Sequence, residues 1–524
     1  MDELSSKRAA SRRAGGGRQA RIAARAAPLS DDMRPVRPGL EGGWYKPLTQ
    51  EGMERIHKAA LQVLEEIGLV DAPQSGIELL TGVGATLGDD GRLRFPPVLV
   101  EDMLEKANRS LTLHAQDPKH DFHPGGYRVH YGTAGAAVNI ANVEERSYRE
   151  SQLHDLYDSA RIADALDNVH FFQRTLVPRD CEDPTDLDLN TLYACLKGTT
   201  KHIGTSFTSV ERAKAGLEML HLVAGSEAAW RERPFVSNSN CFVVPPLKFA
   251  TESCEVMEVL VRGGMPILLL SAGQAGATAP AALAGAVTQA VAECLAGLVY
   301  VNAMAPGHPA IFGTWPFVSD LRTGAMSGGS GEQGLLSSAC SQMGRFYDLP
   351  TGSSAGISDA KLPDMQAGYE RGINTVMTGL SGLNMIYESV GMHGSLLGFC
   401  LESMIIDNDI LGQALRCVRG IEVTEDSVSV EAMRQTCVGG PGHYLGSDQT
   451  LSLMQREYIY PKLGDRTSPK EWEERDKPDL LKRAIAEKDR LLATHFPDHI
   501  SPEVDAAIRA QFNIMLNDPD QQVA

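Results

Sequence analysis

The chain has 524 residues, 43% hydrophobic and 22% charged, which is typical of a soluble globular enzyme with one large core or two to three smaller ones. Its net charge of −18 disfavours nucleic acid and anionic membranes as partners, because phosphate binding needs a basic face. We find no signal core, no apolar run as long as a membrane span and no CxxC pair among the nine cysteines, so we expect free thiols and a cytoplasmic location.

Residues 1–43 are expected to form a disordered basic tail. Before Pro28, seven Lys and Arg residues oppose only Asp2 and Glu3, and Ala, Ser and Gly are abundant. An Arg-rich, acid-poor start is also typical of an organelle transit peptide, but we favour a solvated tail.

Residues 44–125 are expected to form a small α/β subdomain. Thr49 can cap an amphipathic helix that Gly68 would end. Asp89-Asp90-Gly91 is a turn signal between two short strands, and a second helix follows Pro96-Pro97.

Residues 126–445 alternate between strands and helices. The eight candidate strands are 128–131, 170–176, 202–207, 235–240, 266–270, 310–313, 351–354 and 384–388. Helical segments such as 151–166 and 280–304 separate them, so we predict an α/β fold of parallel βαβ units, most naturally a closed (β/α)₈ TIM barrel. A doubly wound open sheet is the alternative, although no G-x-G-x-x-G follows a first strand. Residues 446–524 are expected to be a helical extension on the outside.

In a barrel of this kind the site lies at the C-terminal ends of the strands. The residues after each strand are Tyr131, Thr133, Phe172, Arg174, Thr205, Ser206, Phe207, Asn238, Asn240, Ser271, Gly273, Gln274, Thr314, Trp315, Phe317, Ser358, Asp359, Lys361, Glu388 and His393. Aromatic rings with carboxylates suit a quaternary ammonium, which has no N–H and is recognised by charge and shape. Trp315 is the strongest aromatic candidate, and Glu388 and Asp359 would complete the field around the cation. A buried acid paired with His393 or an arginine is the alternative for Glu388.

The stretch Ser354–Glu370 concentrates polar side chains directly after an apolar strand. One loop and one helix start would hold Asp359, Lys361, Asp364, Gln366 and Tyr369, and such loops commonly carry function. A capped structural loop is the alternative interpretation. We find no metal-ligand set, because the trio His114, His120 and His123 lacks a common zinc spacing.

This stretch resembles the signature of the trimethylamine methyltransferase family. Three later segments are also similar to segments of that family: Ser395–Asp409, Gly439–Gly446 with Thr450, and Tyr460–Leu463 with Trp472. The resemblance covers most of the chain from about residue 45 and also implies a (β/α)₈ barrel. It implies methyl transfer from an amine to the cobalt of a partner corrinoid protein, with no cofactor bound tightly by this chain. Founding members carry pyrrolysine where Ile357 stands here, and an isoleucine offers no electrophile, base or acid.

We therefore expect a methyltransferase that moves a methyl group from a quaternary amine of the betaine class, glycine betaine first, to Co(I) of the partner's cobalamin. Asp359, Glu388 and Lys361 are the expected catalytic residues. The expected substrate-binding residues are Tyr131, Phe172, Trp315, Ile357, Ser358, Gln366, Tyr369 and His393. Lys361, His393, Arg174 or helix-start amides would bind the betaine carboxylate.

Three alternatives differ from this hypothesis in their chemistry. The first is transfer from trimethylamine or another methylamine. The second is a quaternary-amine-binding protein without turnover. The third is a barrel lyase with a Schiff base, for which Lys361 is the one plausible lysine. We also expect that copies of the chain associate, because a large apolar barrel exterior often pairs.

Overall fold

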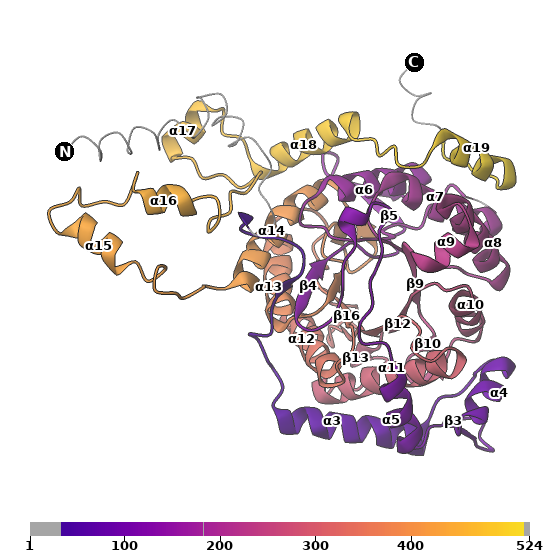
Figure 1. Ribbon diagram of the computed structural model, residues 1–524. Coiled ribbons are helices and arrows are strands. Elements are labelled where there is room, and N and C mark those ends of the chain that lie inside the picture. Colours follow the sequence, from indigo (N-terminus) through magenta and orange to yellow (C-terminus); the bar gives the residue numbers. More distant parts are fainter. Residues whose placement is uncertain (1–32, 182, 518–524) are drawn as a thin grey trace, which may run out of the picture. The chain divides into compact units, whose positions relative to one another are not determined.

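The computed structural model describes residues 33–181 and 183–517, which fold as an α/β protein (Figure 1). The chain divides into two compact units. Among the described residues, the larger unit comprises 38–421 and 461–517, and the smaller unit comprises 422–460 with 33–37. Most of the predicted basic tail, residues 1–32, lies outside the described residues, and the predicted boundaries at 43, 125 and 445 stay predictions.

Eight short parallel strands form the centre of the larger unit, and they confirm the eight predicted strands, with ends that differ by up to three residues. They are β4 (Arg128–Tyr131), β7 (Phe172–Gln173), β8 (Ile203–Thr205), β9 (Val236–Asn240), β12 (Ile267–Ser271), β14 (Ala310–Thr314), β16 (Gly352–Ser354) and β17 (Met385–Tyr387). The pairing orders are β14-β12-β9-β8-β7 and β4-β17-β16. Two further parallel bridges, Gly132 with Phe171 and Phe312 with Thr351, join these two sets. β12 is apolar and buried along most of its length, as a parallel strand covered on both faces requires.

Helices connect these strands and lie around them (Figure 1). They are α6 (Leu153–Ala165), α7 (Pro184–Gly198), α8 (Val210–Ala224), α9 (Glu227–Glu232), α10 (Thr251–Arg262), α11 (Leu283–Met304), α12 (Gly331–Phe346), α13 (Met365–Ser381) and α14 (Leu401–Arg419). Short strands in the loops are β1 (Leu40–Glu41), β5 (Asn139–Asn142), β6 (Ser147–Glu150), β10 (Val243–Val244), β11 (Lys248–Phe249), β13 (Gln274–Ala275), β15 (Phe317–Val318), β18 (Met392–His393) and β19 (Gly398–Phe399). Asp364 caps α13 by accepting hydrogen bonds from the backbone N–H groups of Gln366 and Ala367.

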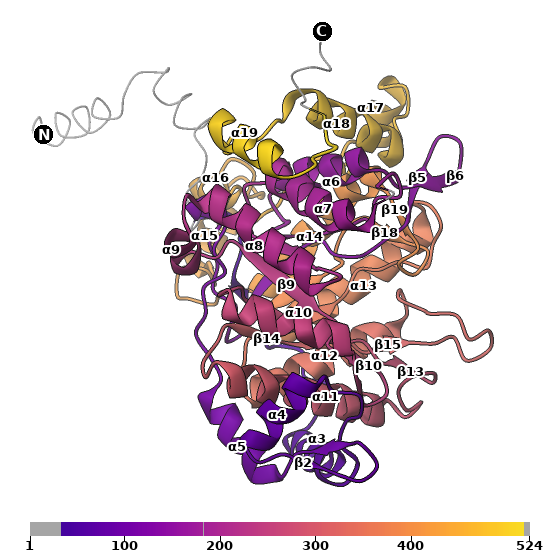
Figure 2. The ribbon, with the colours of Figure 1, turned by 90° about the vertical axis from the view of Figure 1, so that its right-hand side faces the viewer.

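Helix α11 is long and apolar enough to span a membrane, which corrects the expectation that no apolar run reaches that length. Most of its residues are buried inside the protein. Helices α3 (Gln50–Gln62), α4 (Gln74–Gly82) and α5 (Pro97–Lys106) pack against it (Figure 2). α11 is thus a core helix of the larger unit.

The predicted N-terminal elements are present. The Thr49 hydroxyl accepts a hydrogen bond from Gly52 N at 3.1 Å and caps α3. The predicted hairpin consists of β2 (Thr86–Leu87) and β3 (Leu93–Arg94), which pair antiparallel across Asp89–Gly91.

The C-terminal segment is helical, as predicted. Its helices in the larger unit are α17 (Pro469–Glu474), α18 (Leu480–Thr494) and α19 (Pro502–Gln511). α18 packs against α14 and α6, and α19 packs against α8 (Figure 2). The backbone N–H groups of residues 462–464 donate to the Asp409 carboxylate at 2.8–3.1 Å, which fixes the start of this segment on α14. The smaller unit contains α15 (Val430–Cys437) and α16 (Asp448–Leu453).

Candidate active site

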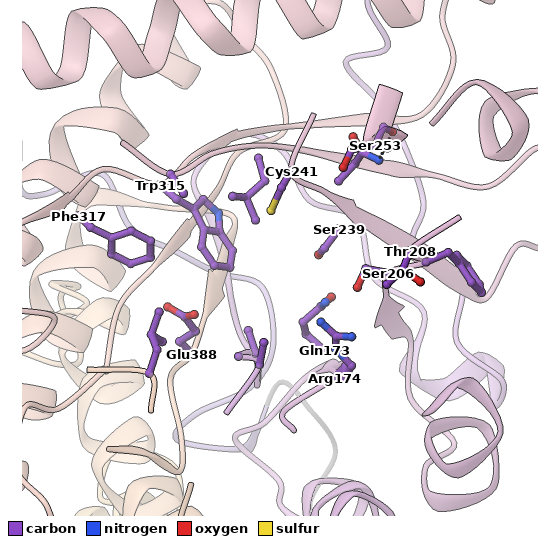
Figure 3. Close-up of a pocket in the computed structure, with 18 of the residues that line it drawn as sticks. Gln173, Arg174, Ser206, Thr208, Ser239, Cys241, Ser253, Trp315, Phe317 and Glu388 are labelled. Atoms are coloured by element: carbon purple, nitrogen blue, oxygen red, sulfur yellow. Dashed lines mark hydrogen bonds between the residues drawn. The ribbon is translucent and has the colours of Figure 1, made fainter. Parts of the chain in front are cut away.

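A cavity of about 470 Å³ lies at the C-terminal ends of the parallel strands (Figure 3). Its lining comprises Ala134, Gly135, Ala136, Gln173, Arg174, Ser206, Phe207, Thr208, Ser239, Asn240, Cys241, Glu252, Ser253, Leu270, Ala272, Trp315, Phe317, Glu388 and Leu396. Most of these residues lie within three residues of the last residue of β4, β7, β8, β9, β12, β14 or β17. Because parallel strands end at the same edge, side chains far apart in the sequence meet in this cavity.

One side of the cavity is aromatic and acidic. Figure 3 shows Trp315 and Phe317 close to Glu388. The Trp315 and Phe317 ring centroids lie 6.4 Å apart, and Tyr387 packs behind Trp315 with its centroid at 5.0 Å. Trp315 is only 5% exposed, and its Nε1–H has no acceptor among the described residues.

Glu388 directly follows β17 and is 2% exposed. Its backbone has a φ of +58°, a conformation that side chains other than glycine rarely adopt and that is common at functional sites. Burial raises the pKa of its carboxyl to about 8, although the Ser354 hydroxyl opposes this shift by a hydrogen bond. Its Oε2 has no partner within the described part of the chain. The carboxyl therefore holds its proton at neutral pH unless a cation lies beside it.

The opposite side of the cavity is polar and basic. Figure 3 shows Arg174 beside Gln173, near Ser206, Thr208 and Ser239. Burial lowers the pKa of the Arg174 guanidinium, which nevertheless stays charged in proteins. In residues 33–181 and 183–517, no acceptor bonds its Nε.

Asn240, the last residue of β9, is 2% exposed. Its Nδ2 donates a hydrogen bond to Ser253 O at 3.0 Å, and its Oδ1 lacks a donor in the described structure. Arg174, Asn240, Trp315 and Glu388 thus bring to one cavity four buried polar atoms that have no partner among the described residues. This arrangement is suited to a ligand that supplies the missing hydrogen bonds.

Two of the predicted catalytic and substrate-binding residues, Trp315 and Glu388, line the cavity. The residues predicted to lie at the strand ends include five further lining residues: Arg174, Ser206, Phe207, Asn240 and Phe317. Three other predicted binding residues are buried outside the lining. The Tyr131 hydroxyl donates a hydrogen bond to Thr375 O at 2.7 Å. Phe172 is fully buried, and Ile357 packs in an apolar cluster with Trp315.

The polar side chains of the predicted signature bond to the chain itself. The Asp359 carboxylate accepts hydrogen bonds from Gly328 N at 2.8 Å, from Ser327 Oγ at 3.0 Å and from Ser395 Oγ at 2.5 Å. It thereby joins the loop before α12 to the loop after β18. Leu396, which lines the cavity, directly follows Ser395.

A second carboxylate, Glu370 on α13, holds the signature loop. Its Oε2 accepts from Ser358 Oγ at 2.7 Å and from Asp359 N at 2.8 Å, and its Oε1 accepts from Gln366 Nε2 at 2.8 Å. Gly356 has a φ of +101°, and a Cβ there would lie 2.8 Å from Ser389 Cα. The signature loop therefore packs directly on the turn that carries Glu388.

The remaining predicted residues also lie outside the lining. Lys361 is exposed, and its Nζ donates to Asp359 O at 2.5 Å. Tyr369 is 59% exposed on α13. The His393 ring nitrogens lie 3.1 Å from Ala360 O and 2.7 Å from Ser403 Oγ, and burial holds its pKa well below the usual range. His393 therefore does not pair with Glu388, contrary to the alternative considered for that acid.

Sequence reasoning missed several lining residues. Gln173, Ser239 and Cys241 each adjoin a residue in the strand-end list, so a window one residue wider would have included them. Glu252 and Ser253 come from the first turn of α10, and the sequence gives no sign that this helix start reaches the cavity. Within the described residues, no group of three or more His, Cys, Asp or Glu side chains could hold a metal ion.

Comparison with known proteins identifies the family. The family model described as Trimethylamine methyltransferase (MTTB) matches residues 13–514. The chain belongs to the trimethylamine methyltransferase family, which confirms the resemblance, and it is a methyltransferase.

Two relatives in this family are named for different substrates. The "Glycine betaine methyltransferase" of Desulfitobacterium hafniense (strain Y51) is 30% identical over 468 residues, which are 89% of this chain and 96% of that protein. The "Trimethylamine methyltransferase MttB" of Desulfitobacterium hafniense (strain DSM 10664 / DCB-2) is 29% identical over 472 residues, 90% of this chain and 94% of that protein. Among solved structures, the monomethylamine methyltransferase MtmB of Methanosarcina barkeri aligns with a TM-score of 0.49 and 11% identity over 88% of this chain and 93% of that one.

Proposed function

We propose that this methyltransferase takes a methyl group from a zwitterionic quaternary amine of the betaine class and passes it to a corrinoid carried by a partner protein. Glycine betaine is the simplest member of that class and the substrate for which one relative is named. The observation that carries this proposal is the set of unpartnered polar atoms on opposite sides of one cavity.

These atoms favour a betaine over trimethylamine. Leaving a buried polar group without a partner costs about 1–3 kcal/mol. Trimethylamine is protonated at neutral pH and then has neither an oxygen nor a lone pair, so it offers no acceptor to Arg174 Nε. A betaine carboxylate provides an acceptor for Arg174 Nε and neutralises the guanidinium. The buried isoleucine at position 357 supports the same choice, because it contributes no group that could activate an amine.

The opposite side of the cavity suits the cation. A tetraalkylammonium has no N–H donor, so it is bound by aromatic faces and by negative charge. Trp315 and Phe317 provide the rings, and Glu388 provides a carboxyl whose proton leaves when a cation lies beside it.

Transfer from a quaternary amine needs no proton. The N–CH₃ bond breaks with its electron pair remaining on nitrogen, so the departing amine is neutral. When bound, the partner's corrinoid supplies Co(I), the nucleophile that accepts the methyl group. The residues of this chain hold the cation, orient one N-methyl group and exclude water. The lining offers a guanidinium, amides and hydroxyls rather than a set of cobalt ligands, which fits a corrinoid held by the partner.

The finer architecture is part of the same proposal. The pairings run from β4 through β7, β8, β9, β12, β14, β16 and β17 and return to β4, which supports a closed (β/α)₈ barrel. A cavity at the C-terminal ends of the strands is where such a barrel places its active site.

The test measures methylation of cob(I)alamin by absorbance, with trimethylamine and a panel of betaines as donors. We expect methylcobalamin to form with a betaine and not with trimethylamine. Arg174→Met should raise the KM for the betaine at least tenfold, whereas the exposed control Arg55→Met should leave it unchanged. Transfer from trimethylamine alone, or an unchanged KM in Arg174→Met, would overturn the proposal.

A further inference from the structure

We propose that the substrate carries a hydroxyl group on the arm between its quaternary nitrogen and its carboxylate, and that Asn240 Oδ1 accepts a hydrogen bond from this hydroxyl. This inference rests on the proposed function of the same cavity and narrows its substrate class.

The orientation of the Asn240 amide is fixed by its neighbour. Nδ2 donates to the backbone oxygen of Ser253 at 3.0 Å. Exchanging the two amide atoms would place two acceptor oxygens against each other, so the free atom is the carbonyl oxygen Oδ1. This oxygen is buried, and no donor reaches it in the described residues. It requires a donor from the ligand.

A simple betaine cannot provide that donor. Its quaternary nitrogen has no N–H, and its carboxylate only accepts hydrogen bonds. Glycine betaine would therefore satisfy Arg174 and still leave Asn240 Oδ1 without a partner. A hydroxyl on the connecting arm supplies the missing donor and also accepts hydrogen bonds from its surroundings.

The size and lining of the cavity support a longer arm. Its volume of about 470 Å³ lies within the range of pockets that bind drug-sized molecules. Glycine betaine has a single carbon between its charged groups. Besides Arg174, the polar side carries the hydroxyls of Ser206 and Ser239, which Figure 3 shows near one another, and the side chain of Ser253. This is more hydrogen-bonding capacity than one carboxylate uses.

The strand itself provides a matched control residue. Asn238 lies two residues before Asn240 on β9, so both side chains are on the same face of the strand. Asn238 is 1% exposed but does not line the cavity. Asn238→Leu therefore tests the effect of losing a buried amide from β9 without changing the cavity.

The experiment uses two zwitterions that differ by one hydroxyl, 4-(trimethylammonio)butanoate and its 3-hydroxy derivative. Binding to the full-length protein is measured by calorimetry, and methyl transfer to cob(I)alamin is measured in parallel. We expect the wild-type protein to bind the hydroxylated zwitterion at least tenfold more tightly. Asn240→Leu should abolish this preference, whereas Asn238→Leu should keep it.

The outcomes separate the two proposals. Equal affinity of the wild-type protein for both zwitterions, or a preference that survives in Asn240→Leu, overturns the hydroxyl assignment and leaves the betaine proposal standing. Failure of the wild-type protein to bind or demethylate any zwitterion, while trimethylamine is demethylated, overturns both. The wild-type comparison needs no variant, so a poorly folded Asn240→Leu protein does not prevent the test.

Discussion

Replacing Glu388 with glutamine is the most informative single change in this site. The carboxyl is buried, has an unpartnered oxygen and has a pKa raised to about 8 by burial. Binding a quaternary ammonium favours the ionised form, so binding should release a proton and strengthen as the pH rises. Glutamine keeps the shape of the side chain and removes the titration.

The size of the effect follows from the pKa. Below about pH 8 each pH unit reduces the ionised fraction of Glu388 tenfold, so wild-type affinity for the cation should fall about two orders of magnitude from pH 9 to pH 6. In Glu388→Gln the affinity should be weaker at pH 9 and nearly independent of pH.

The same group predicts a linked change in stability. Between about pH 4.5 and pH 8 the native state retains a proton that the unfolded state has lost, so the free energy of unfolding falls as the pH rises. Above that window the cost of ionising the buried carboxyl is about 4–5 kcal/mol, taking about 1.4 kcal/mol per pKa unit. Glu388→Gln should therefore be more stable than the wild-type protein at pH 9 by several kcal/mol and similar to it at pH 4.

Calorimetry across pH 6–9 and urea unfolding at pH 4 and 9 measure both effects. Glu293→Gln is the matched control. Glu293 is a buried acid whose pKa is also raised by burial, and its carboxylate bonds Ser271 Oγ and Leu247 N outside the cavity lining. Glu293→Gln should change the pH dependence of the free energy of unfolding and leave the pH dependence of betaine binding unchanged. A wild-type affinity for the betaine that stays constant from pH 6 to pH 9 would refute the role assigned to Glu388.

Two further predictions concern residues that position the cavity walls. Asp359→Ala should abolish methyl transfer while circular dichroism shows a folded protein, because three hydrogen bonds to the loops around the cavity are lost. Normal turnover in this variant would contradict the positioning role of Asp359. Gln333 Nε2 donates to Pro316 O at 2.9 Å, next to Trp315, and to the Ser354 hydroxyl at 3.4 Å, and this hydroxyl lowers the pKa of Glu388. Gln333→Leu should therefore raise the KM for the betaine and shift the pH dependence of binding. Gln342→Leu, on the same helix but bonded to Leu48, should leave the profile unchanged, and an identical shift in both variants would contradict this role.

The strand positions were predictable because parallel strands covered on both faces have short apolar runs bounded by turns. Ile267–Ser271 and Ala310–Thr314 are examples, and both were located within a residue or two. Helix α11 was harder to interpret, because a buried core helix and a membrane span have the same composition. The packing of α3, α4 and α5 against α11 is a tertiary contact, which a local sequence pattern does not predict.

The site was predictable where a side chain directly follows a strand. Trp315, Arg174 and Glu388 were found in this way, because strand order alone sends them to one edge. The signature stretch was less informative about direct contact. Its many polar side chains predicted a ligand-binding loop, whereas Asp359, Ser358 and Gln366 form hydrogen bonds with the protein itself.

This contrast bears on how polar residues should be assigned roles in such a fold. A polar side chain whose bonding capacity is filled by the protein, such as Asp359, can act on the reaction only through the groups it holds in place. A buried polar atom left unbonded at a cavity, such as Glu388 Oε2 or Asn240 Oδ1, has a free energy cost that a ligand can recover. The sequence cannot separate these two cases, because the distinction depends on which loops meet in space. The affinity of the site should therefore depend most on the scattered strand-end residues, and its geometry on the contiguous signature.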